Sequence, residues 1–362
     1  MLTLGVEEEY LLLDPESGLP VARSPRVRAA ADRMSSVEPQ EVEPELLQAQ
    51  VEVGTPVCGS LDEVAGHLAR LRAAVAAAAV TAGCRSAATG AAPSRGRKPV
   101  PVTAKARYRA MSGDAPQLVD EQLINGMHVH VGIPDRDSGV GALNRVRRWL
   151  PVLVALGANS PLWEGGDTGF ASWRTLVFDR WPVSGPPPAF ADAADYASRT
   201  GALVDAGVIM DLGQIYWQAR LSERYPTIEI RALDVQVGID DAVTLAGLVR
   251  ALVHRSLDEH RTMAPDEPVT AELIAAATWH AARHGLDGDL VDPRAGSLAP
   301  AAEVVAALMD HVTPSLEECG DLKRVSRGVD RLLREGNGAQ AQRRAFDDGD
   351  LRAVTELITV DC

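Results

Sequence analysis

Three short runs of the sequence carry pairs of acidic, basic or imidazole side chains at a spacing of two residues. Side chains two apart on a β-strand point to the same face of its sheet. If each run is a strand, its pair therefore shares a face, whereas Glu8 points to the opposite one. Three such strands suggest a sheet with one functional face. The pairs are Glu229 with Arg231, Glu7 with Glu9, and His128 with His130.

Each pair also has an ordinary explanation when taken alone. A strand rich in glutamate is often a solvated edge. A His-x-His strand is often a packing feature, and a Glu-x-Arg strand often holds a salt bridge. Taken together on one chain, the three pairs favour an acidic site that binds cations.

The length and composition describe a globular protein. The chain has 362 residues, of which 46% are apolar, enough for one large domain or two smaller ones. We expect a single catalytic domain over 1–362, with mixed α and β structure to about residue 238 and mainly helices from about 239. Strands early and helices late indicate the α+β class with an antiparallel sheet.

The charge balance narrows the possible partners. Thirty-six Lys and Arg against 50 Asp and Glu give a formal net charge of −14, which disfavours nucleic acid and anionic membranes as partners. An acidic protein that binds an anionic substrate needs bridging cations or a local arginine cluster.

Two further features concern the location of the protein. The apolar stretch 68–83 is interrupted by Arg70 and Arg72 and indicates an ordinary helix instead of a membrane span. No signal peptide is expected, since charged residues follow Met1 almost at once. Scattered cysteines suit a reducing cytoplasm, and these are Cys58, Cys84, Cys319 and Cys362.

The local patterns predict the elements that position the three pairs. A capping box at Ser60–Glu63 begins a helix that runs to about Gly83. The expected strands are 3–13, 48–53, 86–92 and 127–133, with a hairpin of 214–221 and 227–234. Residues 135–141 are expected to be a loop and 159–190 a long irregular segment. Further helices are expected at 143–156, 192–205, 240–261, 267–285, 300–312, 315–335 and 350–359. The polar side of helix 143–156 would carry Arg145, Arg147 and Arg148.

The loop from Pro93 to Lys105 is rich in proline and basic residues. A solvated loop is the first interpretation of this pattern, and a surface that faces phosphates is the second. The basic side chains concerned are Arg95, Arg97, Lys98 and Lys105.

The motifs together resemble the glutamate–cysteine ligase superfamily, and more narrowly its carboxylate–amine ligase branch, also called glutamate–cysteine ligase type 2. The superfamily pattern is carried by Glu7-x-Glu9, by Glu45 and Glu52, by Gly126-Met-His128-Val-His130 and by Thr227-Ile-Glu229-Ile-Arg231. The branch pattern is carried by 159–163, 167–174 and 215–217, and the match extends from Leu4 to at least Arg255.

The resemblance implies both a fold and a reaction. The fold is a curved antiparallel sheet like the catalytic core of glutamine synthetase, with helices on its convex side and ATP and Mg²⁺ on its concave face. In the reaction, ATP phosphorylates a carboxylate and an amine displaces the phosphate to give an amide. The implied substrates are an amino acid such as glutamate and an amine such as cysteine, and a homo-oligomer is compatible with the sequence.

The resemblance also implies roles for individual residues. Mg²⁺ takes oxygen ligands and bridges phosphates, and the guanidinium fork matches a carboxylate or a phosphate. The implied metal ligands are Glu7, Glu9, Glu45, Glu52, His128 and Glu229. The implied catalytic residues are Glu229, Arg231, His128 and Arg174, and the implied ATP-binding residues are Arg220, Arg231, His130 and Lys105.

Some positions depart from the branch pattern. Ala92 stands where a histidine is typical, Ser94 where an aromatic residue is typical, and Gln218 where an acid is common. These departures bear on substrate identity more than on reaction type. Two other functions stay open: a metal-dependent hydrolase, and a nucleotide- or amino-acid-binding protein without catalysis. Hydrolases that use zinc usually have more histidine ligands.

Overall fold

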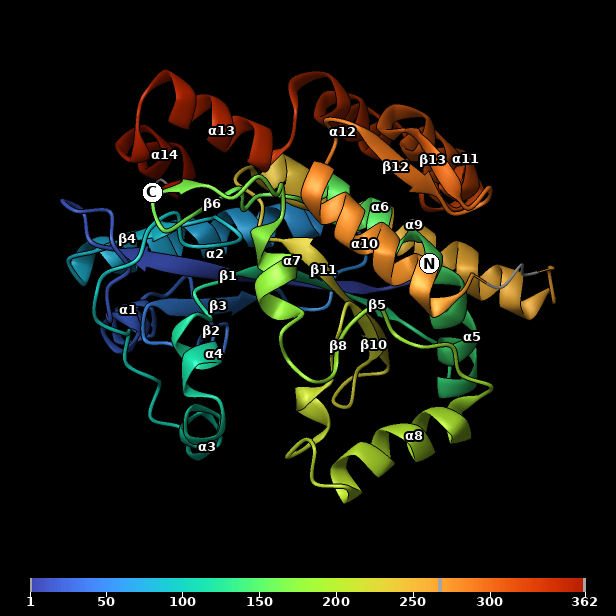
Figure 1. The fold of residues 1–362 in the computed structure, drawn as a ribbon, viewed down its shortest axis with the longest axis horizontal. Helices are drawn as coiled ribbons and strands as arrows, with labels where there is room; N and C mark the ends of the chain where they lie inside the picture. Colours follow the sequence, from blue (N-terminus) through green and yellow to red (C-terminus); the bar gives the residue numbers. More distant parts are fainter. Residues whose placement is uncertain (1, 266–268, 361–362) are drawn as a thin grey trace.

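The computed structural model describes residues 2–265 and 269–360, and a seven-stranded antiparallel sheet lies at its centre (Figure 1). The strand order is β10-β11-β5-β1-β3-β2, and β4 also pairs with β1. The bounds are β1 Leu4–Leu13, β2 Val42–Pro44, β3 Gln50–Gly54, β4 Arg85–Ala87, β5 Gly126–Gly132, β10 Ala219–Leu221 and β11 Thr227–Asp234. The predicted α+β arrangement with an antiparallel sheet is thereby confirmed.

The register of this sheet brings the three sequence pairs together. Glu7 lies opposite His128 on β5, and Glu9 lies opposite Glu52 on β3. On the other side of β5, Glu229 lies opposite His130. Residues directly opposite in an antiparallel pair point to the same face, so the charged side chains of four strands collect on one face.

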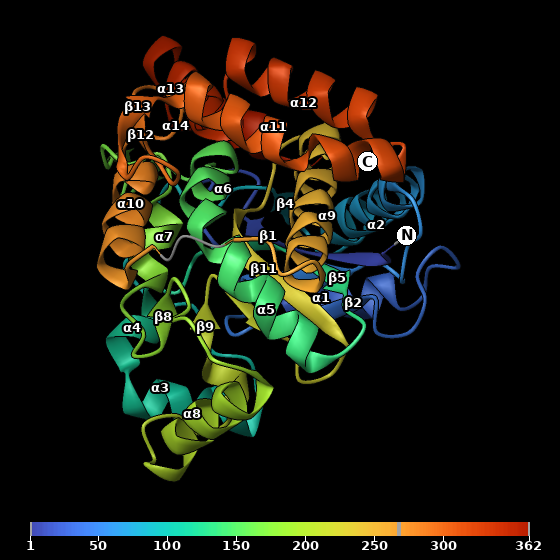
Figure 2. The same ribbon diagram turned by 90° about the vertical axis from the view of Figure 1, so that its right-hand side faces the viewer.

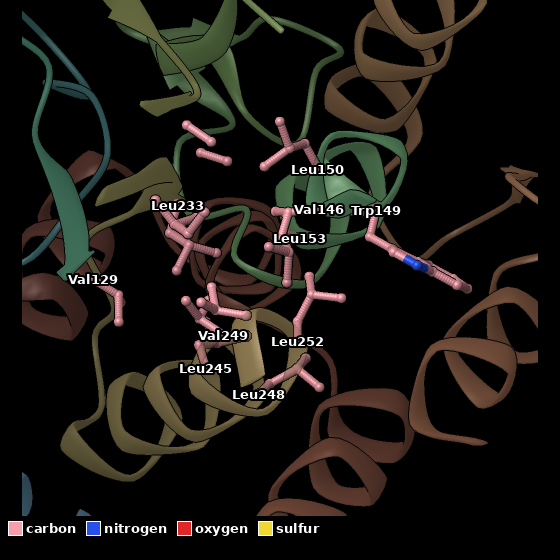
Figure 3. Packing of buried hydrophobic residues seen from close by; sticks show 14 of the residues in the cluster. Val129, Val146, Trp149, Leu150, Leu153, Leu233, Leu245, Leu248, Val249 and Leu252 are labelled. Carbon is pink, nitrogen blue, oxygen red and sulfur yellow. The ribbon is translucent and has the colours of Figure 1, made fainter. Parts of the chain in front are cut away.

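The other face of the sheet is mainly apolar and is covered by helices. The covering helices are α2 Leu61–Thr81, α5 Arg136–Val146, α6 Leu150–Leu156 and α9 Ile239–Arg261. Figure 3 shows Val129 of β5 and Leu233 of β11 near Leu153 of α6 and Val249 of α9. Each of these side chains is at most 1% exposed, and burying one contributes roughly 1.5–3 kcal/mol. This core fixes the sheet from behind and leaves its front for the site.

Glu8 points to the helical face, as expected, and meets a buried cation there. Arg72 of α2 donates to both carboxylate oxygens of Glu8, at 2.5 and 2.9 Å. The same guanidinium donates to the main-chain oxygens of Gln236 and Val237. Arg72 thus ties β1, α2 and the segment before α9 together.

The C-terminal third forms an outer helical layer, part of which packs on α6 and part on α9 (Figure 2). Its elements are α10 Ala271–His284, the hairpin β12 Asp289–Asp292 with β13 Ser297–Pro300, α11 Ala301–Cys319, α12 Leu322–Glu335, α13 Gly338–Asp348 and α14 Leu351–Ile358. On the opposite side of the sheet lie α3 Ala106–Asp114, α4 Pro116–Asp120 and α8 Ala193–Asp205 (Figures 1 and 2). Within the described ranges, no helix has the length and apolar character needed to cross a bilayer.

Two predictions about the first helices after β5 are wrong. Residues 136–141 are helical, because Asp135 caps the start of α5 by accepting a hydrogen bond from the Ser138 main-chain N–H at 2.8 Å. Arg147 lies in a turn of 3₁₀-helix between α5 and α6 and is buried, not on a polar side. Its guanidinium donates to the main-chain oxygen of Pro187.

Three more predictions need correction. Helix α11 runs through Pro314, since buried neighbours such as Val312 and Leu316 hold it in place despite the lost hydrogen bond. Only β10 pairs with β11, because β9 Tyr216–Trp217 pairs in parallel with β8 Ser184–Gly185. The segment 159–190 is irregular over most of its length, as predicted, but it also contains the short elements β6 Leu162–Trp163, β7 Gly166–Asp167 and α7 Trp173–Phe178. Helix α1 Ser24–Ala31, helix α13 and the hairpin β12–β13 were not predicted.

Candidate active site

His128 lies at the centre of a carboxylate cluster on the front of the sheet. Its Nδ1 is 3.2 Å from Glu7 Oε2 and 4.0 Å from Glu229 Oε1, and its Nε2 is 3.9 Å from Glu9 Oε1. The imidazole is only 3% exposed, and its Nε2 is buried without a hydrogen-bond partner. An unsatisfied ring nitrogen among carboxylates is available to a ligand that the cluster surrounds.

Two sets of three side chains in this cluster could each hold a metal ion. The sets are Glu7, His128 and Glu229, and Glu9, Glu52 and His128, with the potential ligand atoms of each set within 4.8 Å of one another. Carboxylate oxygens are the ligands that hard cations such as Mg²⁺ prefer. The residues present therefore fit such ions. Glu45 belongs to neither set, although it lines the same cavity.

The electrostatics of the cluster show that it lacks positive charge at its centre. Burial raises the pKa of Glu52 well above its usual value, and repulsion from Glu7, Glu45 and Glu9 adds to this effect. Burial also raises the pKa values of Glu9 and Glu45. Burial acts the same way on Glu7, but hydrogen bonds from His128 and His130 outweigh it and lower the pKa. Cations bound here would relieve the repulsion.

Glu229 is held by two arginines at the edge of the cluster. Arg220 of β10 donates to both of its oxygens, at 2.7 and 3.2 Å, and Arg231 pairs with it from the same strand face. Burial acts to raise the pKa of Glu229, but the charges of Arg231 and Arg220 outweigh it and hold the pKa far below the usual range. Arg231 Nε is buried without a hydrogen-bond partner. The predicted shared face of Glu229 and Arg231 is confirmed, and the salt bridge considered as its alternative is also present.

A second guanidinium lies beside that of Arg231. Arg174 donates to the main-chain oxygen of Arg231 at 3.2 Å, and both guanidinium groups lie over the ring of Phe178, at 5.3 and 5.9 Å from its centroid. Arg174 Nε is also buried without a hydrogen-bond partner. Two buried cations that share one ring repel each other at this depth, so this part of the site favours an anion bound between them. Gly126 makes room, because a Cβ there would collide with the Arg174 guanidinium.

The cluster lies where two cavities meet. The smaller cavity is about 800 Å³ and is lined by Arg174, Arg231 and aromatic side chains such as Phe178 and Tyr216. The larger groove is about 1660 Å³ and opens between Pro56, Tyr225 and the end of α9. Both are lined by Glu7, Glu45, Glu52, Lys105, Tyr108, His130, Arg224 and Tyr225. All six implied metal ligands line the smaller cavity: Glu7, Glu9, Glu45, Glu52, His128 and Glu229.

The implied ATP-binding residues are divided between the interior and the rim. His130 lies 3.0 Å from Thr227 Oγ1 through its Nδ1 and 3.5 Å from Glu7 through its Nε2. Lys105 is exposed at the rim of both cavities, donates to the main-chain oxygen of Pro44 and lies over the Tyr108 ring. Elsewhere in the basic loop, Arg95 forms an ion pair with Glu164, which fits the solvated-loop interpretation.

Several residues of the site were not found from the sequence. Phe178 and Tyr216 line the smaller cavity, and Asp234 is buried beside it with the hydroxyls of Ser160 and Ser172. The only available signal was indirect: both serines lie in the segments that carry the branch resemblance. Of the departures from that pattern, Ala92 is buried in an apolar cluster and Gln218 lines neither cavity.

Similarity to known sequences extends over nearly the entire chain. The model of a family described as "Glutamate-cysteine ligase family 2(GCS2)" matches residues 3–357. A protein of Saccharopolyspora erythraea that carries the provisional name glutamate–cysteine ligase 2-1 is 42% identical over 361 residues, which are 99% of this chain and 94% of that protein. A protein of Salinispora arenicola provisionally named glutamate–cysteine ligase 2 is 45% identical over 358 residues, 98% of this chain and 93% of its own length.

Solved structures show the same fold at low sequence identity. A glutamate–cysteine ligase from Francisella tularensis, crystallised in complex with AMP, superposes with a TM-score of 0.74 at 12% identity, over 99% of this chain and 87% of that one. A bifunctional glutathione synthetase from Pasteurella multocida superposes with a TM-score of 0.69, also at 12% identity, over 99% of this chain and 52% of that one. The open antiparallel sheet with a helical C-terminal part is thus a fold that these enzymes share.

Proposed function

The chain belongs to glutamate–cysteine ligase family 2, and on that basis we propose that it is an ATP-dependent carboxylate–amine ligase that forms a γ-glutamyl amide. In this reaction the γ-carboxylate of the acid attacks the γ-phosphorus of ATP, so an acyl phosphate forms and ADP leaves. The amine nitrogen then attacks the acyl carbon, and inorganic phosphate leaves as the C–N bond forms. The substrates are small molecules: an amino acid such as glutamate, and an amine such as cysteine.

This proposal rests on one observation: an acidic cluster and two buried arginines line the same cavity. Glu7, Glu9 and Glu52 line the smaller cavity together with Arg174 and Arg231. Phosphoryl transfer needs opposite charge around the transferring group, because its three oxygens carry the negative charge of the transition state. A metal-dependent hydrolase would not require the arginines, and each potential metal set here contains only one histidine.

The metal ions would be Mg²⁺ held by the two sets that meet at His128. Glu7 and Glu229 would complete one set, and Glu9 and Glu52 the other, with Glu45 close enough to the cavity to assist. Bound there, Mg²⁺ would supply positive charge that offsets the negative charge of the phosphates. The carboxylates hold and space the ions, and the burial of the cluster keeps competing water away.

The chain's own cations would bind and orient the substrates. Arg231 is next to a metal ligand and is suited to the γ-phosphate, since its planar fork can donate two hydrogen bonds at once. Arg174 lines the smaller cavity, and its free Nε is suited to a carboxylate of the acid. The larger groove has room for the nucleotide, with Lys105 and His130 along its wall. Arg220 would act with Arg231 by holding Glu229 in place.

The compartment and the assembly form part of the same proposal. Cys58, Cys84 and Cys319 are buried free thiols, a pattern that suits the reducing cytoplasm; Cys362 lies outside the described residues. We place the enzyme in the cytoplasm as a single catalytic unit over 1–362. A homo-oligomer stays compatible with this arrangement.

The experiment is an ADP-release assay across a matrix of acids and amines. We expect Mg²⁺-dependent release of ADP only when an acid and an amine are both present, with glutamate and cysteine as the first pair. The double variant Glu9→Gln/Glu52→Gln, which removes one metal set, serves as the inactive control. Nucleotide binding without turnover for every pair would instead favour a binding protein, and AMP with pyrophosphate would exclude the acyl-phosphate route.

A further inference from the structure

Asp234, at the end of β11, is a buried carboxylate outside both metal sets. It is 1% exposed, and its two oxygens accept three hydrogen bonds. Oδ2 accepts from the main-chain N–H of Asn159 at 2.8 Å and from Ser160 Oγ at 2.7 Å, and Oδ1 accepts from Ser172 Oγ at 2.9 Å. Its neighbour Gly90 leaves no space for a side chain, since a Cβ there would lie 2.5 Å from the Asp234 carboxyl carbon.

The two serines connect Asp234 to the helix that carries Arg174. Ser172 is the N-cap of α7 and accepts from the Thr175 main-chain N–H. Ser160 Oγ accepts from the main-chain N–H of Arg174 itself at 3.1 Å. Both hydroxyls that hold the first turn of α7 therefore donate to the same carboxylate.

Asp234 also acts on Arg174 through its charge. Burial lowers the pKa of Arg174, and among the charged groups Asp234 opposes this effect most strongly. Burial likewise raises the pKa of Asp234 itself, so the folded protein is less stable with this group ionised than with it neutral. A buried charge that reduces stability and faces a site cation is typical of a functional position.

We propose that Asp234 is a positioning residue for Arg174: through Ser160 and Ser172 it fixes the first turn of α7, and its charge holds the Arg174 guanidinium at the wall of the smaller cavity. This inference rests on the proposed function in one respect: it takes from it that Arg174 binds a carboxylate of the acid substrate. Asp234 itself lines neither cavity and contacts no substrate.

The same network reaches the C-terminal helices. Gln342 of α13 is fully buried and donates to both the main-chain oxygen and the Oδ1 of Asn159, at 2.9 and 2.7 Å. Asn159 in turn donates to Asp234 and, through its amide, to the main-chain oxygens of Ala88 and Val235. Helix α13 thus supports the loop that holds α7, although more than 160 residues separate Gln342 from Arg174.

The test compares Asp234→Asn with the wild-type enzyme in kinetics and stability. Asparagine keeps the shape of the side chain, and its amide oxygen can still accept hydrogen bonds from Asn159 and Ser160. Its amide N–H₂ group would lie toward Ser172, whose hydroxyl can rotate to accept from it. We expect kcat/KM for the acid to fall on the order of 10²-fold, the effect of a positioned group that shifts by about 1 Å. The KM for ATP should change less than about twofold and the melting temperature should stay the same or rise, since a buried charge is removed.

Two further proteins separate positioning from stability. Asp321→Asn is the matched control, because Asp321 is also buried and pairs with Arg250, and neither residue lines either cavity. It should lower the melting temperature and leave both KM values unchanged. Ser172→Ala removes one hydrogen bond to Asp234 and keeps its charge, so it should raise the KM for the acid by roughly threefold to tenfold. If Asp234→Asn does not fold, an unchanged KM for the acid in Ser172→Ala overturns the proposal.

A crystal structure of Asp234→Asn tests the proposal without any assay. We expect the Arg174 guanidinium to leave its place over Phe178 or to lose its single position. The positioning role is overturned if the Arg174 guanidinium stays in place, or if kcat/KM falls equally for ATP and for the acid. If the wild-type enzyme releases no ADP with any pair, the proposed function fails, and the position of Arg174 in the two structures still decides this inference.

Discussion

Arg231 and Glu229 form an ion pair on one face of β11, and Glu229 belongs at the same time to a set of side chains suited to a metal ion. When a cation binds Glu229, the guanidinium next to it is left with unbalanced positive charge and attracts an anion. On the proposed function, we therefore expect Arg231 to exchange Glu229 for a phosphate when a cation binds.

Replacement of Arg231 by lysine tests this switch. Arg231→Lys keeps the charge and one hydrogen bond to Glu229 but loses the planar fork. We expect kcat to fall about 10²- to 10³-fold, the usual effect of removing a donor from a transition state, and the melting temperature to change little. Thermal unfolding and ADP release are measured on the same sample. Wild-type turnover in the folded variant would refute the role, and a large loss of stability would support a structural salt bridge.

Metal binding should release protons and strengthen as the pH rises. Burial raises the pKa values of Glu52, Glu9 and Glu45 above the ordinary value of 4.5, and repulsion between carboxylates adds to this effect for Glu52 and Glu9. Mg²⁺, in contrast, needs ionised carboxylates. Calorimetry in two buffers of different ionisation enthalpy would count the protons that Mg²⁺ displaces. Binding with no proton release, or with equal affinity at pH 6 and pH 8, would contradict this account of the cluster.

The same carboxyls set the pH dependence of stability in the absence of metal. A folded-state pKa above the unfolded value means that the folded protein holds the proton more tightly. Protonation of these carboxyls therefore contributes fully to the stability of the folded state below about pH 4.5. This contribution is lost as the pH rises through the folded-state pKa. In EDTA, Glu52→Gln should make the protein more stable than wild type at pH 8, with a smaller difference at pH 5. Urea unfolding at both pH values measures this, and a destabilised variant at pH 8 would count against it.

The ion pair behind the sheet gives a prediction about stability alone. Arg72→Met would leave Glu8 charged and buried without its partner, which costs about 3–5 kcal/mol in a buried pair. Arg70→Met on the same helix is the matched control, since Arg70 pairs with Glu41 nearer the surface. We expect this variant to lose no more than about 1 kcal/mol of unfolding free energy. Urea denaturation of both variants decides the matter, and equal losses would show that burial of the Arg72 pair is unimportant.

The sequence predicted the part of the site that strand periodicity controls. Glu7, Glu9 and His128 were placed on one face because alternation along a strand is a local property. Their convergence with Glu229 required only that the strands pair, and the register confirms it. Their roles as ligands stay a proposal.

The remaining features depend on contacts between distant parts of the chain. Asp234 receives hydrogen bonds from residues 62–75 positions away, so no local pattern shows its use. Phe178 lies in α7, within a segment whose sequence predicts no regular element. The continuation of α11 through Pro314 depends on tertiary packing, which outweighs the local preference of proline to end a helix.

The central claim is that a carboxylate of the substrate is activated as an acyl phosphate at this cluster. The most direct measurement uses glutamate with ¹⁸O in its γ-carboxylate, supplied with ATP, Mg²⁺ and the amine that gives turnover. The account predicts that each inorganic phosphate released carries one ¹⁸O atom, because the carboxylate oxygen that attacked phosphorus leaves with the phosphate. Unlabelled phosphate, as produced when water attacks ATP, would contradict the claim.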